Sequence, residues 1–393
     1  MQTVINILKS SRVLYSLYYC LGSLLLKMAG CFIRTDNRLI LINSFGGKKY
    51  DDSPKAIFLE MLKEKRFSKY KIVWAIGNGN HYDEIKYSVK PDTIDYFVTA
   101  LKAKVWITNS SMERGLKFKK KETIYINTNH GTPIKKMGTD IVSNSNAFGT
   151  AKKLSGADIM FAQSEFEVDV FSSAFNRSKE AFYITGLPRN DDLVNVSKEK
   201  IERIKEKLGI NNEKILLYAP TFRDYSRKNK TGGISLSLPI KLEKWQKLLE
   251  GKYKVLFRAH YEVAEYLNIK NYSVFIDVTK YPTLSDLMII SDALISDYSS
   301  IMIDYSILHK PIYCFAYDLE EYSRKRGMYI DIRKELPCKI NYSEDELLKE
   351  ILREDYEKYQ KRLISFQRKY ATVYGDSAKR CCDIIYNKIC TDN

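Results

Sequence analysis

Short apolar runs alternate with longer segments of helical periodicity along most of the chain, and this alternation is typical of the α/β class. Residues 39–42, for example, form an unbroken apolar run of the kind found in a parallel strand covered on both faces. The predicted strands are 39–42, 71–76, 105–108, 123–127, 159–162 and 182–185 in the first half, and 215–218, 254–257, 274–278, 293–295 and 311–315 in the second. Because alternating strands and helices are joined by right-handed crossovers, the pattern predicts parallel sheets.

The alternation occurs in two units of similar size, separated by a charged helical segment at residues 196–212. A chain of 393 residues is long for one hydrophobic core and sufficient for two domains. We therefore expect two doubly wound, Rossmann-like domains that face a shared cleft, and a mostly helical C-terminus. The expected ranges are 1–36 for an N-terminal helix, 37–200 for the first domain, and 201–393 for the second domain with the terminal helices.

The N-terminal segment contains an uncharged run, residues 13–26, that is rich in Leu and Tyr and flanked by basic residues. A membrane-spanning helix needs about 20 apolar residues, and Lys27 interrupts the run before that length. One interpretation is a peripheral (monotopic) helix that lies against an anionic membrane surface on the cytoplasmic face. A helix packed on its own domain is the alternative, and the sequence leaves both open.

The formal net charge of +16 indicates an anionic partner: a membrane surface, a phosphate-bearing substrate or nucleic acid. The basic residues are spread along the chain and match no nucleic-acid-binding motif, so we expect no nucleic-acid partner. The seven cysteines include no C-x-x-C pair, which favours a reduced protein without a structural zinc site. No D-x-D pair stands at a predicted strand end, so we expect no cofactor and no tightly bound metal.

Residues 294–308 read as a short buried strand, a tight polar loop and a helix. Ser299 and Ser300 stand where the helix should begin, beside unpaired main-chain N–H groups and the positive end of the helix dipole. Such a site can hold an anion such as phosphate. From this stretch alone a serine that only caps the helix is the simpler interpretation.

Two of the four histidines directly follow predicted strands. His130 comes after strand 123–127 and precedes Gly131, and His260 comes after strand 254–257. Ligands of open parallel sheets bind beyond the carboxyl ends of the strands, so both histidines are candidates for the site.

Five short motifs occur in a fixed order: HGTP at 130–133, TGLPRND at 185–191, YAPTFR at 218–223, RAH at 258–260, and SDYSS at 296–300 followed by Asp304 and Tyr305. Together they resemble the CDP-glycerol:glycerophosphotransferases, the teichoic acid primases and polymerases of Gram-positive bacteria. The resemblance implies a GT-B architecture and an enzyme that acts at the cytoplasmic face of the membrane. Tyr261 stands where the family has proline, which puts the placement of His260 in question.

The resemblance implies transfer of glycerol phosphate from CDP-glycerol to a hydroxyl of a lipid-linked or polymeric acceptor, with release of CMP. It makes His130 the general base, and it places His260 with Ser299 and Ser300 at the pyrophosphate. The candidate catalytic residues are His130 and His260. The candidate substrate-binding residues are Gly131, Thr132, Pro188, Arg189, Asn190, Thr221, Arg223, Arg258, Asp297, Ser299, Ser300 and Asp304.

For Asp297 and Asp304 two interpretations stay open: they orient a histidine or bind ligand hydroxyls, or they are a cap and a surface carboxylate. For the activity, the alternatives are a CDP-ribitol-dependent transferase, a GT-B glycosyltransferase that uses a nucleotide sugar, and a non-enzymatic membrane-associated scaffold. The sequence leaves the acceptor and the oligomeric state open.

Overall fold

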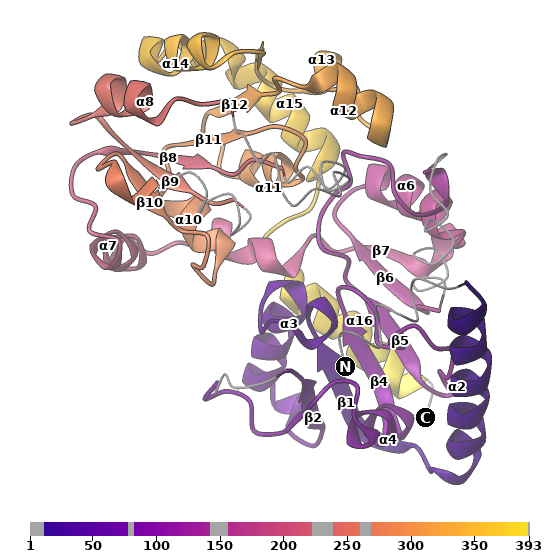
Figure 1. Ribbon diagram of the computed structural model, residues 1–393. Helices are drawn as coiled ribbons and strands as arrows, with labels where there is room; N and C mark the ends of the chain where they lie inside the picture. The colour runs from indigo at the N-terminus through magenta and orange to yellow at the C-terminus, as the bar shows by residue number, and fades with distance from the viewer. Residues whose placement is uncertain (1–11, 78–81, 142–155, 222–238, 260–268, 392–393) are drawn as a thin grey trace.

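The computed structural model describes residues 12–77, 82–141, 156–221, 239–259 and 269–391 (Figure 1). His260, Tyr261 and Arg223 lie outside these ranges, so the expectations for them are not addressed by the structure.

Two parallel sheets organise the described chain, as the alternation of strands and helices predicts. The first has seven strands in the order β3-β2-β1-β4-β5-β6-β7, and the second has six in the order β10-β9-β8-β11-β12-β13. The strands of the first sheet are β1 (Asp36–Asn43), β2 (Lys71–Ala75), β3 (Ser88–Val89), β4 (Ala103–Thr108), β5 (Ile124–Asn127), β6 (Ile159–Ala162) and β7 (Phe182–Ile184). Those of the second are β8 (Lys214–Tyr218), β9 (Tyr253–Phe257), β10 (Phe275–Asp277), β11 (Ala293–Ser296), β12 (Ile312–Phe315) and β13 (Ile340–Asn341). In both sheets the order reverses beside the first strand, which creates the switch point where α/β folds bind ligands.

The helices lie between the strands and cover the sheets (Figure 1). Their bounds are α2 (Arg12–Phe32), α3 (Asp52–Lys63), α4 (Ile94–Lys102), α6 (Glu165–Phe175), α7 (Lys198–Lys207), α8 (Leu242–Leu249), α10 (Leu284–Ile290), α11 (Ile301–Ser306), α12 (Leu319–Arg326), α13 (Ile332–Glu335), α14 (Glu344–Arg353), α15 (Gln360–Tyr370) and α16 (Ser377–Thr391).

The last helix belongs to the core of the first sheet, which corrects the expected second-domain range of 201–393. Cys381, Cys382 and Ile385 of α16 are fully buried in one cluster with Ile57 of α3 and Ile40 of β1. Figure 1 shows α16, in yellow, lying among the indigo and purple elements of the N-terminal half. An amphipathic pattern shows that a helix has a buried face but not which sheet it covers, so the sequence could not assign α16.

The close packing of Gly186 against the residues at the start of α16 explains why the 185–191 motif has a glycine. Gly186 has a φ of +82°, and a Cβ atom there would lie 2.4 Å from Ser377 Oγ and 2.6 Å from Val373 O. Only glycine tolerates both the left-handed backbone and this close approach. Gly186 therefore serves the return of the chain from the second domain to the first.

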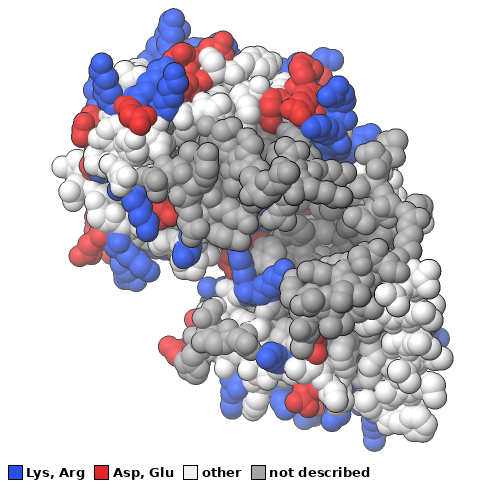
Figure 2. All heavy atoms as spheres, viewed as in Figure 1, with Lys and Arg blue, Asp and Glu red and all other residues white. Residues whose placement is uncertain are grey.

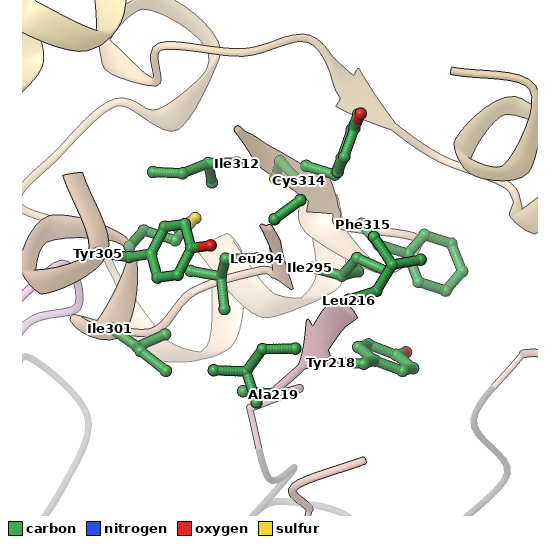
Figure 3. Close-up of a cluster of buried hydrophobic side chains, with 14 of the residues drawn as sticks. Leu216, Tyr218, Ala219, Leu294, Ile295, Ile301, Tyr305, Ile312, Cys314 and Phe315 are labelled. Atoms are coloured by element: carbon green, nitrogen blue, oxygen red, sulfur yellow. The ribbon is translucent and has the colours of Figure 1, made fainter. Parts of the chain in front are cut away.

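In the second domain a single buried cluster fixes the position of α11. Leu216, Leu294 and Ile312 of neighbouring strands face Ile301 and Tyr305 of α11 (Figure 3), and burying each aliphatic side chain contributes about 2 kcal/mol. The Tyr305 hydroxyl also lies 3.2 Å from the main-chain oxygen of Ser291. These contacts hold α11 at the carboxyl end of β11, and with it the loop that precedes the helix.

Helix α2 combines features of the two interpretations that the sequence left open. One side packs on the first domain: Leu26 contacts the buried cluster of that domain, and Ser23 Oγ accepts a hydrogen bond of 2.9 Å from the main-chain N–H of Lys117. The other side carries a row of exposed residues, Leu17, Leu21, Leu24 and Met28, which are 51%, 56%, 55% and 55% exposed. Among the described residues, the segment Val13–Phe32 is the only helix long and apolar enough to cross a membrane.

Candidate active site

The loops that follow β5 and β11 are in contact where the two domains meet. His130 and Gly131 follow β5, and Ser299 and Ser300 follow β11. A Cβ atom on Gly131, which has a φ of +134°, would lie 2.6 Å from Ser300 Oγ and 2.9 Å from Arg189 Nη2. The glycine therefore permits direct contact between the histidine loop of one domain and the serine loop of the other.

The structure fixes the tautomer of His130. Its Nδ1 atom lies 3.0 Å from the main-chain oxygen of Asn109 at the end of β4, and the edge of the Phe45 ring lies against the imidazole. Because a carbonyl oxygen only accepts, Nδ1 must carry the proton, and the neutral ring keeps its lone pair on Nε2. The side chain is exposed. His130 thus has the tautomer and the access that a general base requires.

Hydrogen bonds at the end of β5 hold the main chain before His130. Asn127 Nδ2 donates to the main-chain oxygen of Ser110 at 3.0 Å, and Asn127 Oδ1 accepts from the N–H of Asn129 at 2.8 Å. The polar ends of β4 and β5 are thus joined before the chain reaches His130.

Arg189, Asn190 and Asp304, three expected substrate-binding residues, are joined to one another. Arg189 Nη2 lies 2.5 Å from Asp304 Oδ2, and Asn190 Nδ2 lies 2.8 Å from Asp304 Oδ1. Arg189 Nη1 also donates to Asp52 Oδ2 at 3.0 Å and to the main-chain oxygen of His130 at 2.7 Å. We call Arg189, Asn190 and Asp304 the domain clamp, because these residues link the first domain and the histidine loop to α11 of the second domain.

Burial and charge oppose each other in the domain clamp. Burial alone would lower the pKa of the Arg189 guanidinium, but Asp304 and Asp52 more than offset it, so the pKa is raised. For Asp304, burial raises the pKa of the carboxyl, and Arg189 and Asn190 oppose the rise. Asp304 is 2% exposed, so the interpretation as a surface carboxylate is wrong. Because both oxygens of Asp304 are occupied within the protein, the geometry favours positioning over substrate contact.

The structure supports the capping interpretation for Ser299 but not for Ser300. Ser299 Oγ accepts a long hydrogen bond of 3.4 Å from the main-chain N–H of Ile301, and the Ser300 side chain makes no capping hydrogen bond. Both serines are partly exposed, and α11 has only six residues, which limits its dipole. The hydroxyls themselves are therefore the groups that can meet an anion in the cleft.

Asp297 ties the serine loop to the end of β8. Its Oδ1 atom accepts from the main-chain N–H groups of Thr221 at 2.9 Å and Tyr298 at 2.6 Å. Asp297 is 2% exposed. Asp297 thus holds the Thr221 main chain beside the serine loop. Its carboxylate is neither a helix cap nor a surface group.

Three other expected substrate-binding residues, Arg258, Pro188 and Thr132, are buried or partly buried. Arg258 Nη1 donates to the main-chain oxygens of Val278 and Tyr281 at 3.1 and 2.8 Å, and burial lowers the pKa of its guanidinium. Pro188 is buried at the start of a short 3-10 helix. Thr132 is fully buried, and its hydroxyl donates to Glu167 at 2.5 Å. Thr132 therefore cannot contact a substrate in this conformation.

A second contact joins the domains beside the histidine loop. Lys135 and Met328 form an antiparallel bridge, in which the Lys136 N–H donates to Gly327 O at 3.1 Å and the Tyr329 N–H donates to Ile134 O at 2.9 Å. The main chain of Lys135 and Lys136 is thus part of a contact between the two domains.

Sequence reasoning missed Asn109, Asp52 and Glu167. Asn109 directly follows β4, so the strand-end rule applied to His130 could have found it. Glu167 completes an S-x-x-E pattern with Ser164, which predicts a helix start but not the contact with Thr132. Among the described residues no cluster of three His, Cys, Asp or Glu side chains could hold a metal ion.

The sequence pattern of the CDP-Glycerol:Poly(glycerophosphate) glycerophosphotransferase family matches residues 25–387. A teichoic acid glycerol-phosphate transferase of Staphylococcus aureus is 33% identical over 371 residues, covering 89% of this chain and 93% of that protein. A teichoic acid poly(glycerol phosphate) polymerase of Staphylococcus epidermidis is 33% identical over 370 residues, covering 90% of this chain but only 51% of the polymerase. The chain thus spans nearly all of one relative and about half of the other.

Solved structures agree with the sequence comparison. A histidine variant of the wall teichoic acid polymerase TagF, soaked with CDPG, superposes with a TM-score of 0.84 at 31% identity, over 93% of this chain and 92% of that one. A UDP-GlcNAc 2-epimerase from Neisseria meningitidis shares the fold alone, with a TM-score of 0.53 at 15% identity over 89% of this chain and 99% of the epimerase. The expected GT-B type architecture is confirmed. The chain belongs to the CDP-glycerol:poly(glycerophosphate) glycerophosphotransferase family.

Proposed function

We propose that the protein transfers glycerol phosphate from CDP-glycerol to a hydroxyl of a membrane-linked acceptor, releasing CMP, in the synthesis of teichoic acid or a related polymer. The observation that carries this proposal is the approach of the His130 loop to the Ser299–Ser300 loop across the cleft. A base on one wall and a pair of hydroxyls on the other suit a reaction that deprotonates an acceptor and stabilises a leaving phosphate.

In the proposed reaction the acceptor oxygen attacks the glycerol-bearing β-phosphorus of CDP-glycerol. His130 Nε2 takes the proton of the acceptor hydroxyl, since Nδ1 is committed to Asn109. The bond between the β-phosphorus and the bridging oxygen breaks, and CMP leaves with the electron pair. The protein forms no covalent bond with the substrates in this reaction, so positioning and charge stabilisation account for the rate acceleration.

The leaving phosphate gains negative charge, and hydrogen-bond donors on the second domain should stabilise it. The hydroxyls of Ser299 and Ser300 are partly exposed at this position. His260, Arg258, Arg223 and Thr221 are the further donors that we propose for this phosphate, and the Thr221 main chain is held beside the serine loop by Asp297. Gly131 and Pro188 shape the opposite wall, where Gly131 admits the close approach of Ser300.

A donor panel tests the activity. CDP-glycerol, CDP-ribitol and UDP-N-acetylglucosamine are incubated separately with the protein and a lipid-linked oligo(glycerol phosphate), and released nucleotides are quantified. We expect CMP from CDP-glycerol, at the same rate with and without a chelator, because the basic cleft replaces a metal ion. Faster turnover of CDP-ribitol would move the assignment to ribitol phosphate. Release of UDP would indicate glycosyl transfer, and activity restored by magnesium would overturn the metal-free mechanism.

We also propose that α2 holds the protein on the cytoplasmic face of the membrane as a peripheral helix. Its exposed row of leucines projects from the first domain, and Figure 2 shows that the lower right of the view, where Figure 1 places α2, is largely free of charged side chains. An apolar row on a strongly basic protein suits binding to an anionic bilayer.

The double variant Leu17→Glu with Leu21→Glu should weaken binding to vesicles that contain phosphatidylglycerol by at least about tenfold, because it places two carboxylates on the exposed face of α2 that is proposed to enter the membrane. Vesicle co-sedimentation measures the binding. Leu62→Glu, at a leucine that is 53% exposed on α3, is the matched control and should sediment like the unmodified protein. Equal sedimentation of all three proteins would show that α2 does not contact the membrane.

A further inference from the structure

The hydroxyl of Thr132 is enclosed by protein although His130 lies only two residues away. Thr132, Gln163 and Glu167 are all 0% exposed. Thr132 Oγ1 lies 2.5 Å from Glu167 Oε1 and 2.6 Å from Gln163 Nε2. The histidine loop is thus hydrogen-bonded, behind the cleft, to the start of α6.

The directions of these hydrogen bonds assign the roles of the atoms. Gln163 Nε2 can only donate, so Thr132 Oγ1 accepts from it and must donate its own proton to Glu167 Oε1. The other carboxylate oxygen, Oε2, accepts from the main-chain N–H of Gln163 at 2.7 Å. Both oxygens of Glu167 are therefore acceptors, which is the arrangement that suits a carboxylate.

Helix capping does not account for this arrangement. Ser164 Oγ caps α6 by accepting from the Glu167 N–H at 3.4 Å, and an exposed glutamate at the helix start would complement the dipole equally well. Glu165 in the same turn is such an exposed residue. Glu167 is instead fully buried, and burial raises the pKa of its carboxyl to about 7. Burying a carboxyl costs free energy, so the burial of Glu167 indicates a function that an exposed carboxyl could not perform.

The segment that carries His130 is held from two sides. The main-chain oxygen of His130 accepts from Arg189 Nη1 at 2.7 Å, and the side chain of Thr132 is held by Glu167. Gly131, between them, lies against Ser300 of the other domain. The charge of Asp304 raises the pKa of Glu167 and that of Arg189 lowers it, so the domain clamp influences the Glu167 carboxyl electrostatically.

We propose that Glu167 is a positioning residue for glycerophosphate transfer: through the Thr132 hydroxyl it fixes the main chain that carries His130, and so directs Nε2 toward the acceptor hydroxyl. This inference rests on the proposed role of His130 as the base. Glu167 touches no reactant, so its loss should affect the rate of the chemical step more than donor binding.

The experiment compares Thr132→Val, which keeps the shape but removes the hydroxyl, with Glu167→Gln and Thr132→Ser. Thr132→Val and Glu167→Gln should each lower kcat about tenfold, with KM for CDP-glycerol within about twofold of the unmodified protein. Thr132→Ser, which retains the hydroxyl, should keep kcat within about threefold. The double variant Thr132→Val with Glu167→Gln should be no slower than the slower of these two single variants, because both changes break the same hydrogen bond.

Two matched controls lie in the same region. Thr139→Val removes an exposed hydroxyl that donates to Ser173 O at the other end of α6, and Glu165→Gln neutralises an exposed carboxylate of its first turn. Both should leave kcat within about twofold. Additive losses in the double variant, or an unchanged kcat in Thr132→Val, would overturn the proposal.

Nuclear magnetic resonance of protein with ¹⁵N-labelled histidine gives a readout that does not depend on activity. The chain has four histidines, so the signals of His130 can be assigned by their absence in His130→Asn. We expect the Nδ1–H tautomer in the unmodified protein and a mixed tautomer in Glu167→Gln. An unchanged His130 spectrum in Glu167→Gln would overturn the proposal even where Thr132→Val fails to fold. Absence of CMP release from the unmodified protein would instead refute the proposed function.

Discussion

His130→Asn is expected to lower the rate of CMP release from CDP-glycerol by about 10²–10⁴-fold, the usual contribution of a general base. Asparagine can still donate from its amide to the main-chain oxygen of Asn109, as Nδ1 does in the native protein. Nothing in the new side chain replaces the lone pair of Nε2. The acceptor hydroxyl would therefore keep its proton as it attacks, and the barrier rises.

Initial-rate measurements with quantified CMP test this prediction, together with the dissociation constant of CDP-glycerol from calorimetry, which should change by about twofold at most. His309→Asn is the matched control, because His309 is exposed after α11 and has a φ of +53°, which asparagine tolerates. Full turnover by His130→Asn would show that His130 is not the general base.

Asp304→Asn should destabilise the protein by about 3 kcal/mol, because it leaves the Arg189 guanidinium in a buried site without its closest counter-charge. It should also loosen the contact between the domains, since Arg189 carries the link between His130 and α11. We expect a lower midpoint of urea unfolding, a larger radius of gyration in small-angle X-ray scattering, and a reduced kcat.

The double variant Arg189→Met with Asp304→Leu separates charge from packing. If the pair acts as a unit, the loss of unfolding free energy in the double variant will be smaller than the sum of the losses in Arg189→Met and Asp304→Leu. Asp92→Asn is the matched control: its partner Arg114 lies in the same domain, and both are partly exposed. The control should leave the radius of gyration unchanged. An unaltered radius in Asp304→Asn would show that the clamp does not hold the domains together.

The sequence predicted the strands well where they are buried on both faces. Residues 39–42 and 215–218 are continuous apolar runs because parallel strands meet helices above and below, and the structure places them in β1 and β8. The edge strands β3 (Ser88–Val89) and β13 (Ile340–Asn341) were not predicted, because two residues are too few to show a period.

The site was predictable where it depends on strand ends and not where it depends on pairing across the chain. His130, Ser299 and Ser300 follow strands directly, so the rule for open sheets places them at the cleft. Arg189 and Asp304 are separated by 115 positions and belong to different domains, and no local pattern indicates that they pair. Thr132 lies beside His130 in sequence, yet only the structure shows that its hydroxyl is bonded to Glu167.

The most direct test of the mechanism uses CDP-glycerol labelled with ³²P at the β-phosphate, in a single turnover with a lipid-linked acceptor. The mechanism predicts that the label appears in the acceptor as CMP is released in equal amount, and that both products form about 10²–10⁴-fold more slowly with His130→Asn. Label that remains in the released nucleotide, or transfer at the native rate by His130→Asn, would contradict it.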